Sequence, residues 1–134
     1  MANELYQKQI IELARESRKR VRIDAPDTTI RFDNPLCGDR IDLDFLIEDG
    51  RISDIGFKVR GCALCEASSE LLAQNANGYQ LQELNTVGSK LSDYLVGKIE
   101  NPDWEGFEVF EPVKSVPPRH ECVLLPFNAI KKVI

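Results

Sequence analysis

The spacing of apolar residues predicts an amphipathic helix at the beginning of the chain. Between residues 4 and 18 the apolar side chains recur at roughly helical intervals, with charged residues between them: Leu5, Ile10, Ile11, Leu13 and Ala14. A helix with this pattern packs one face on the rest of the protein and leaves the other in water. The chain is therefore expected to begin with a surface helix.

Three later segments have the patterns of β-strands. The segment at 28–32 is short and rich in β-branched residues, and the segments at 40–48 and 51–60 alternate apolar with polar residues. The last two flank Asp49 and Gly50, a strong hairpin signal, because both central positions of such a tight turn favour positive φ. A small antiparallel sheet of about three strands is expected.

The apolar period becomes helical after the hairpin. Apolar residues from 64 to 72 share one helical face, and Asn77-Gly78 supplies a stop signal. Two shorter helices are expected at 80–85 and 88–97. The chain is therefore expected to turn at Asn77-Gly78 and to continue as two short helices.

The last third of the chain predicts an irregular arm and a final helix. Four prolines and a cluster of aromatic residues lie between 101 and 118, with one helical turn expected at about 104–110. The final helix should run from about 126 to 133, because proline is tolerated at a first helical position but costs about 3 kcal/mol deep inside a helix. Cys122 is then expected just before this helix or in its leading turn.

One domain over residues 1–134 accounts for all of these elements. A chain of this length with 43% hydrophobic residues is sufficient for a real core. Trp104, Phe107 and Phe110 lie at about helical spacing and are predicted to belong to that core. The expected fold is α+β, with a small antiparallel sheet covered by helices on one side.

The composition removes several classes of function. Seventeen basic and twenty-two acidic residues give a net charge of −5 without a basic stripe, so no nucleic-acid partner is expected. No apolar run approaches the length of about 20 residues that spans a membrane, and the charged amino terminus does not resemble a signal peptide. A cytoplasmic protein without a membrane partner is predicted. In that reducing compartment four cysteines favour metal binding, thiol chemistry or burial over disulfides.

Three of the cysteines lie where predicted elements begin or end. Cys37 lies in a turn before the hairpin, Cys62 follows the second hairpin strand at a helix start, and Cys122 follows Pro117-Pro118. Backbone N–H groups at such places favour a thiolate and lower the thiol pKa from about 8.5. Each cysteine taken alone is equally consistent with a small buried apolar residue.

The segments around these cysteines resemble a known family. NPLCGDRIDL at 34–43, GFKVRGCALCEASSELL at 56–72 and PPRHECVLLPFNAI at 117–130 are similar to the three cysteine blocks of IscU/SufU/NifU-type iron-sulfur cluster assembly scaffolds. The long interval between Cys62 and Cys122 is nearer the SufU-like branch. The resemblance covers most of the chain and implies a SufE/NifU-like fold.

The resemblance implies a metal or cluster site made of four residues. Carried over position by position, these are Cys37, Asp39, Cys62 and Cys122. Three thiolates suit zinc or the iron of a cluster, and a carboxylate is a harder and weaker ligand for either metal. Such a site should hold a cluster less permanently than four cysteines would, which suits a scaffold that passes its product on.

The three residues that directly precede Cys122 are possible auxiliary residues of the site. Glu121 stands where IscU-type members have a histidine, and the single histidine of the chain, His120, lies one position earlier. His120 is either solvated or a proton shuttle or replacement ligand. Arg119 matches a basic residue of the family and would pair with Asp39 or Glu121, or lie in water.

Cys65 is an addition to the family pattern, which usually has a small hydroxyl residue there. Cys62 and Cys65 are three apart, a spacing that puts both on one helix face, with about 5–6 Å between their Cβ atoms. One C-x-x-C is half of a zinc signature, and the chain contains no second one. Cys65 is predicted to pack on the inner face of the helix, with a spare ligand or a resolving thiol as the alternatives.

The resemblance implies a scaffold rather than an enzyme. Such a scaffold accepts sulfur from a cysteine desulfurase, binds a 2Fe-2S cluster transiently and transfers it to apo acceptor proteins. Cys122 is predicted to accept the first sulfur as a persulfide, on the premise that it lies on a mobile segment. The alternatives are a zinc-dependent sulfurtransferase, with Zn²⁺ on the same four residues, and a non-catalytic zinc-stabilised domain. The sequence leaves iron and zinc as equal possibilities.

Overall fold

Three antiparallel strands form one sheet in the order β1-β2-β3. The structure is a computed structural model that describes residues 2–134, with side chains from Glu4 onward. The strands are β1 (Thr28–Asp33), β2 (Arg40–Glu48) and β3 (Arg51–Arg60). Asp49 and Gly50 form the turn between β2 and β3 with φ of 53° and 77°. The predicted hairpin is confirmed.

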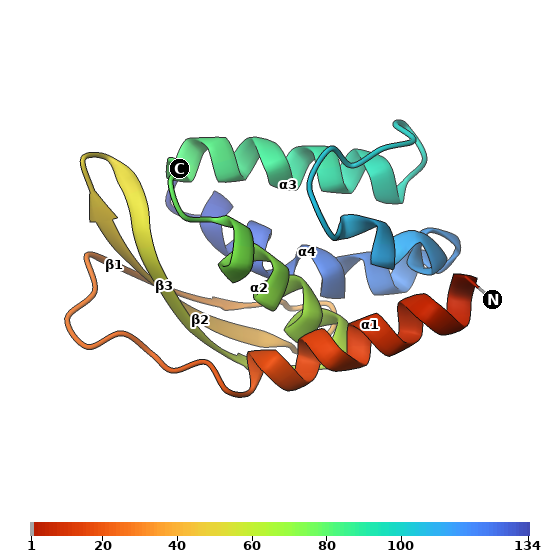
Figure 1. Ribbon diagram of the computed structural model, residues 1–134, viewed down its shortest axis with the longest axis horizontal. Coiled ribbons are helices and arrows are strands. Elements are labelled where there is room, and N and C mark those ends of the chain that lie inside the picture. Colours follow the sequence, from red (N-terminus) through yellow and green to blue (C-terminus); the bar gives the residue numbers. More distant parts are fainter. Residues whose placement is uncertain (1) are drawn as a thin grey trace.

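The helices lie on one face of this sheet. They are α1 (Ala2–Ser17), α2 (Ala63–Asn75), α3 (Leu81–Leu95), the 3-10 helices η1 (Phe107–Ser115) and η2 (Pro117–Arg119), and α4 (His120–Lys131). Helix α2 contacts β3, and α4 contacts β1 and β2, while α1 packs on α2 and α3 packs on α4 (Figure 1). The predicted α+β fold with helices on one side of the sheet is confirmed. None of the helices in the described part of the chain is both long and apolar enough to cross a membrane.

The period of two along β2 separates an apolar face from a polar face. Ile41, Leu43 and Phe45 are fully buried in the hydrophobic core under the helices. Asp42 and Asp44 alternate with them and so point to the opposite face, where they are also buried. Burial of a charged carboxylate costs free energy unless the charge is paired and hydrogen-bonded. Arg31 pairs with Asp42, and Arg22 pairs with Asp44.

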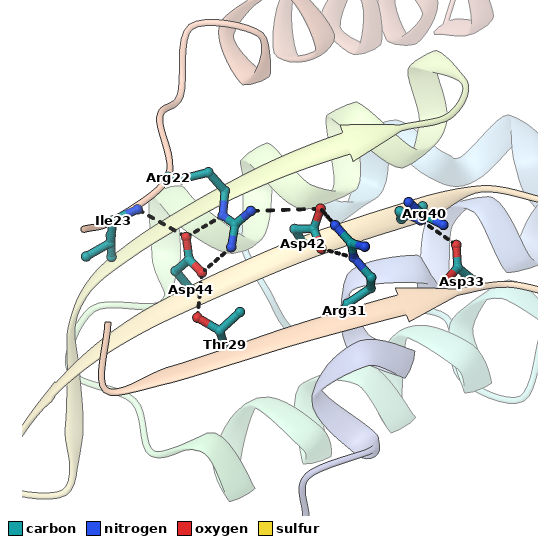
Figure 2. A network of polar contacts seen from close by, with 8 residues as sticks. All are labelled: Arg22, Ile23, Thr29, Arg31, Asp33, Arg40, Asp42 and Asp44. Atoms are coloured by element: carbon teal, nitrogen blue, oxygen red, sulfur yellow. Dashed lines mark hydrogen bonds and ion pairs between the residues drawn. The ribbon is translucent and has the colours of Figure 1, made fainter. Parts of the chain in front are cut away.

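The chain between α1 and β1, residues 18–27, covers the polar face of the sheet. Asp44 accepts hydrogen bonds from Arg22 Nε at 2.6 Å and Arg22 Nη2 at 2.9 Å (Figure 2). It also accepts from the Ile23 amide at 3.1 Å and from Thr29 Oγ1 at 2.8 Å. One buried carboxylate therefore fixes the connecting segment and the edge strand to the centre of the sheet.

Replacement of Asp44 by asparagine should lower the free energy of unfolding at pH 7 by about 2 kcal/mol, because hydrogen bonds to a charged group contribute about 1.5–3 kcal/mol. Burial raises the pKa of Asp44, but the hydrogen bonds from Arg22, Thr29 and Ile23 outweigh it and leave this pKa below its ordinary value. A lowered folded-state pKa gives stability that is present above the unfolded value of about 3.9 and is lost as pH falls through the folded value. The difference between wild type and variant should therefore shrink below about pH 4.

Urea unfolding at neutral and acidic pH measures this difference. The matched control is Asp33→Asn, which removes a carboxylate that is 55% exposed from its pair with Arg40. Exposed pairs contribute at most about 1 kcal/mol, so the control should change little at either pH. A loss in Asp44→Asn that does not depend on pH would rule out the carboxylate as its cause.

Residues 81–95 form one helix, and the prediction of two helices at 80–85 and 88–97 is wrong. Gly88, the first residue of the second expected helix, lies inside α3. A Cβ at this position would lie 2.8 Å from the Cβ of Phe127 in α4. The glycine therefore marks a close approach between two helices rather than a break in one of them.

Helix α4 begins at His120, so the predicted start at residue 126 is also wrong. Pro126 lies inside the helix and is buried. It has no amide hydrogen to donate to the carbonyl of Cys122, four residues earlier, which removes one hydrogen bond from the first turn. Cys122 lies in that leading turn, which was one of its two predicted positions.

The aromatic residues of the arm belong to the core, as predicted. Phe107 and Phe110 are fully buried, and Trp104 packs partly buried against the core cluster. The Phe107 ring centroid lies 4.9 Å from that of Trp104 and 5.7 Å from that of Phe127. The arm is also more regular than expected, since the 3-10 helix η1 replaces a single turn.

Candidate metal centre

Four side chains bring possible ligand atoms together at one end of the sheet. The sulfurs of Cys62, Cys65 and Cys122 and a carboxylate oxygen of Asp39 all lie within 4.8 Å of one another. Asp39 lies one residue before β2, Cys62 directly precedes α2, Cys65 is in the first turn of α2, and Cys122 is in the first turn of α4. Side chains that are distant in the sequence therefore converge, as the predicted site requires.

Contacts between the elements hold these residues in place. Ser68 Oγ on α2 donates a buried hydrogen bond to the Val123 carbonyl on α4 at 2.5 Å, which joins the two cysteine-bearing helices. Cys65 Sγ donates to Asp39 Oδ2 at 2.8 Å. A Cβ on Gly61 would lie 2.9 Å from Asp39 Cγ, so the glycine leaves the space that the carboxylate occupies.

The thiols differ in how readily they ionise. The hydrogen-bond contact between the Cys62 and Cys65 sulfurs lowers the pKa of Cys62 to about 5, even though burial opposes this shift. The same interaction, together with burial, raises the pKa of Cys65, and burial raises the pKa of Cys122 to about 12. At neutral pH the site therefore holds one thiolate and two thiols, and a bound cation would be needed to keep all three as thiolates.

The donor set fits zinc or iron. Tetrahedral zinc with Zn–S bonds of about 2.3 Å places its sulfur ligands about 3.8 Å apart. Cys62 Sγ and Cys65 Sγ are separated by 3.8 Å. Three sulfurs and one carboxylate oxygen are ligands that both metals accept. The residues present can therefore hold either zinc or the iron of a cluster.

Cys37 lies beside this group and not within it. Its side chain is exposed on the turn before β2, next to Leu36, which is 80% exposed. Partial burial raises the pKa of Cys37, and Asp39 and Cys122 are near enough to affect this pKa as well. Its sulfur does not belong to the four mutually close atoms. The ligand role that the resemblance implies for Cys37 therefore stays a prediction.

Cys65 is fully buried, as predicted, but its burial does not separate it from the site. Its sulfur lies within the group and contacts both Asp39 and Cys62. The prediction that Cys62 acts while Cys65 only packs does not describe this geometry. The C-x-x-C spacing was the signal that pointed to the alternative roles of Cys65.

Arg119 lies beside the site, whereas His120 points away from it. The Arg119 guanidinium lies near the Cys122 thiol, and this proximity raises the pKa of Arg119. Among the ion pairs of residues 4–134, none joins Arg119 to Asp39 or Glu121 as the sequence suggested. The His120 ring nitrogen Nε2 lies 3.0 Å from the Val113 carbonyl, so the histidine contacts the end of η1 and is absent from the four-atom group.

Glu121 ties the turn that carries Cys37 to the helix that carries Cys122. Its Oε2 accepts hydrogen bonds from Asn34 Nδ2 at 3.0 Å and from Asn128 Nδ2 at 3.2 Å. Asn34 is buried, and its own side-chain oxygen accepts a hydrogen bond from the Leu36 amide at 2.8 Å. No local pattern indicates this positioning role, because Asn34 and Glu121 are far apart along the chain.

The structure is a small α+β domain in which three cysteines and one aspartate, a set that could hold a metal ion, meet at the ends of its elements. The family described as the NifU-like N terminal domain matches residues 5–103, and the chain belongs to this family. The matched segment includes Asp39, Cys62 and Cys65 and ends before Cys122. The predicted family resemblance is confirmed.

Relatives within the family have two kinds of name. The iron-sulfur cluster assembly scaffold protein IscU of Streptococcus pyogenes serotype M1 is 27% identical over 98% of this chain and 84% of that protein. The zinc-dependent sulfurtransferase SufU of Bacillus subtilis is 28% identical over 77% of this chain and 71% of that protein.

Solved structures agree with the fold. A NifU-like protein (N-terminal) from Brucella abortus has a TM-score of 0.80 at 30% identity and covers 93% of this chain and 88% of that chain. A putative iron-sulfur cluster assembly scaffold protein for the SUF system from Fervidobacterium islandicum has a TM-score of 0.83 at 26% identity, with 92% of each chain covered.

Proposed function

We propose that this protein is a cytoplasmic iron-sulfur cluster assembly scaffold. It accepts sulfur from a cysteine desulfurase, binds a 2Fe-2S cluster transiently and passes it to apo acceptor proteins. The observation that carries the proposal is the convergence of three sulfurs and one carboxylate oxygen within 4.8 Å. The relatives named as cluster assembly scaffolds support it.

The mixed donor set suits temporary binding. Cysteine sulfur is a soft ligand that iron in a cluster prefers, whereas the Asp39 carboxylate is a harder and weaker one. The carboxylate is also shared, because Cys65 donates a hydrogen bond to it. A cluster held at one corner by this oxygen would be released more readily than one held by four cysteines.

Exposure indicates where sulfur enters the site. Cys122 was predicted as first acceptor because it was expected on a mobile segment, but the structure places it in a helix with 3% of its surface exposed. Cys37 is exposed, and its thiol interacts with that of Cys122. We therefore propose Cys37 as the entry thiol and Cys122 as the second acceptor, reached from Cys37.

Persulfide mapping tests this order. After a short reaction with a cysteine desulfurase and limiting cysteine, an added sulfur atom should be found by mass spectrometry on Cys37 first and on Cys122 later. Cys37→Ser should prevent loading of Cys122, because none of the three remaining thiols is exposed to receive sulfur from the desulfurase. If Cys37→Ser still loads Cys122 at the wild-type rate, Cys122 is the first acceptor and Cys37 is not the entry thiol.

A zinc-dependent sulfurtransferase is the second candidate, favoured by the named relative from Bacillus subtilis. In that case Asp39, Cys62, Cys65 and Cys122 would hold Zn²⁺, and the metal would supply a positive charge that keeps the sulfurs as thiolates. Cys37, outside the group, would remain free to accept sulfur. A zinc ion that only stabilises the fold is the third possibility.

Metal analysis with an absorption spectrum of protein purified without oxygen separates these candidates. Iron with sulfide and visible charge-transfer bands supports the scaffold. Colourless protein with one zinc that stimulates a cysteine desulfurase supports the sulfurtransferase. Zinc that cannot be removed without unfolding, in a protein that gives no stimulation, would identify a structural site and reject both other functions.

A further inference from the structure

Cys62 and Cys65 form a close pair of thiols inside the site. Their sulfurs are 3.8 Å apart, and a disulfide bond needs about 2.05 Å. Cys62 has extended backbone angles, φ −81° and ψ 173°, because it stands just outside the first turn of α2. Its side chain can therefore turn toward Cys65 without breaking the hydrogen-bond ladder of the helix.

The chemistry of sulfur delivery leaves two electrons to be supplied. A desulfurase donates sulfur as a persulfide, in which the outer sulfur is at the oxidation level of elemental sulfur. A cluster contains sulfide, which is two electrons more reduced. A second thiol next to a persulfide can provide those electrons by thiol–disulfide exchange.

We propose that the Cys62 sulfur takes the outer sulfur from a persulfide on Cys122, which lies within 4.8 Å and is left as a thiol, and that Cys65 is the resolving thiol that then releases sulfide from the Cys62 persulfide. The Cys65 sulfur attacks the inner sulfur of the Cys62 persulfide, and a Cys62–Cys65 disulfide forms. The bond between the inner and outer sulfur breaks, and the outer sulfur leaves with the electron pair and with the Cys65 thiol proton as hydrosulfide. The two cysteine sulfurs are oxidised to the disulfide, and a dithiol reductant of the thioredoxin class restores them.

The surroundings of the pair suit this step, which rests on the proposed acceptance of sulfur. Cys65 is fully buried, so it reacts within the site rather than with external thiols. Its contact with Asp39 Oδ2 at 2.8 Å holds its sulfur between the carboxylate and Cys62. The Arg119 guanidinium lies close to the thiols of Cys62 and Cys122 and offers a positive charge to the departing hydrosulfide.

The test uses metal-free protein that is loaded with persulfide by a desulfurase and then desalted without oxygen and without reductant. Wild type is expected to release one hydrosulfide for each disulfide formed, with that disulfide mapped to Cys62 and Cys65. Cys65→Ser keeps a similar volume and a hydrogen-bond donor toward Asp39, but it should retain its persulfide until a dithiol is added. Loaded persulfide is measured in both proteins, and release is expressed per persulfide, so a difference in loading does not enter the comparison.

A second measurement does not depend on sulfur delivery. Titration of the metal-free protein in a thiol–disulfide redox buffer should give a Cys62–Cys65 disulfide in wild type and none in Cys65→Ser, with circular dichroism confirming that both remain folded. Release of hydrosulfide from Cys65→Ser at the wild-type rate, or a wild-type disulfide between other cysteines, would overturn the inference. If no persulfide loads but the disulfide forms in the redox buffer, the proposed sulfur acceptance fails and the reactivity of the pair stands.

Discussion

Replacement of Cys62 by alanine is expected to weaken zinc binding by at least about 100-fold. Changes to groups behind metal ligands alone cost about 10–100-fold, and this substitution removes a ligand atom itself. Cys62 is also the thiol whose pKa is lowered, to about 5, so it is ready to bind a metal at neutral pH without losing a proton first. The affinity can be measured on metal-free protein by competition with a chromophoric zinc chelator.

Cys37→Ala is the informative comparison for this measurement. Its sulfur lies beside the four-atom group and not within it, so its loss should change the affinity far less than the loss of Cys62. Equal losses in the two variants would place Cys37 among the ligands. An unchanged affinity in Cys62→Ala would remove Cys62 from the metal site.

Replacement of Phe107 by alanine should lower the free energy of unfolding by about 3–5 kcal/mol, the usual cost of deleting a buried aromatic ring. Phe107 is fully buried, and its ring packs against those of Trp104, Phe110 and Phe127. It joins η1 to α4, so the cavity left by its removal would lie between two elements. Urea unfolding of the metal-free protein gives the free energy directly.

Val96→Ala is the control for this substitution. Val96 is 57% exposed, and surface changes of this kind usually alter stability by less than about 0.5 kcal/mol. A loss below about 1 kcal/mol in Phe107→Ala would show that the aromatic cluster tolerates the cavity and is not a central part of the core.

Elements defined by local chemistry could be predicted from the sequence. The strands at 40–48 and 51–60 have the predicted boundaries, because alternation and the Asp49-Gly50 turn are properties of neighbouring residues. The predicted gap before residue 88 and the predicted helix start at Pro126 are wrong for the opposite reason, since both positions lie inside helices. Gly88 and Pro126 each disfavour a helix locally, but packing between α3 and α4 stabilises both helices through those positions.

The candidate site shows the same division. The family pattern predicted that Asp39, Cys62 and Cys122 would meet, and the structure brings them together. The membership of Cys65 depends on how closely Asp39 approaches α2, which depends in turn on the missing side chain of Gly61. The position of the Cys37 sulfur beside the four-atom group depends on the path of an exposed turn. Neither distance is encoded in the spacing of residues along the chain.

The bond between Asn34 and Glu121 makes two distant segments mechanically dependent. A partner that displaces the exposed turn would also displace the beginning of α4, because this hydrogen bond joins the two segments. This part of α4 already lacks one backbone hydrogen bond, because Pro126 has no amide hydrogen to donate to the Cys122 carbonyl. Docking at the surface and loosening of the buried thiol would then be one movement rather than two.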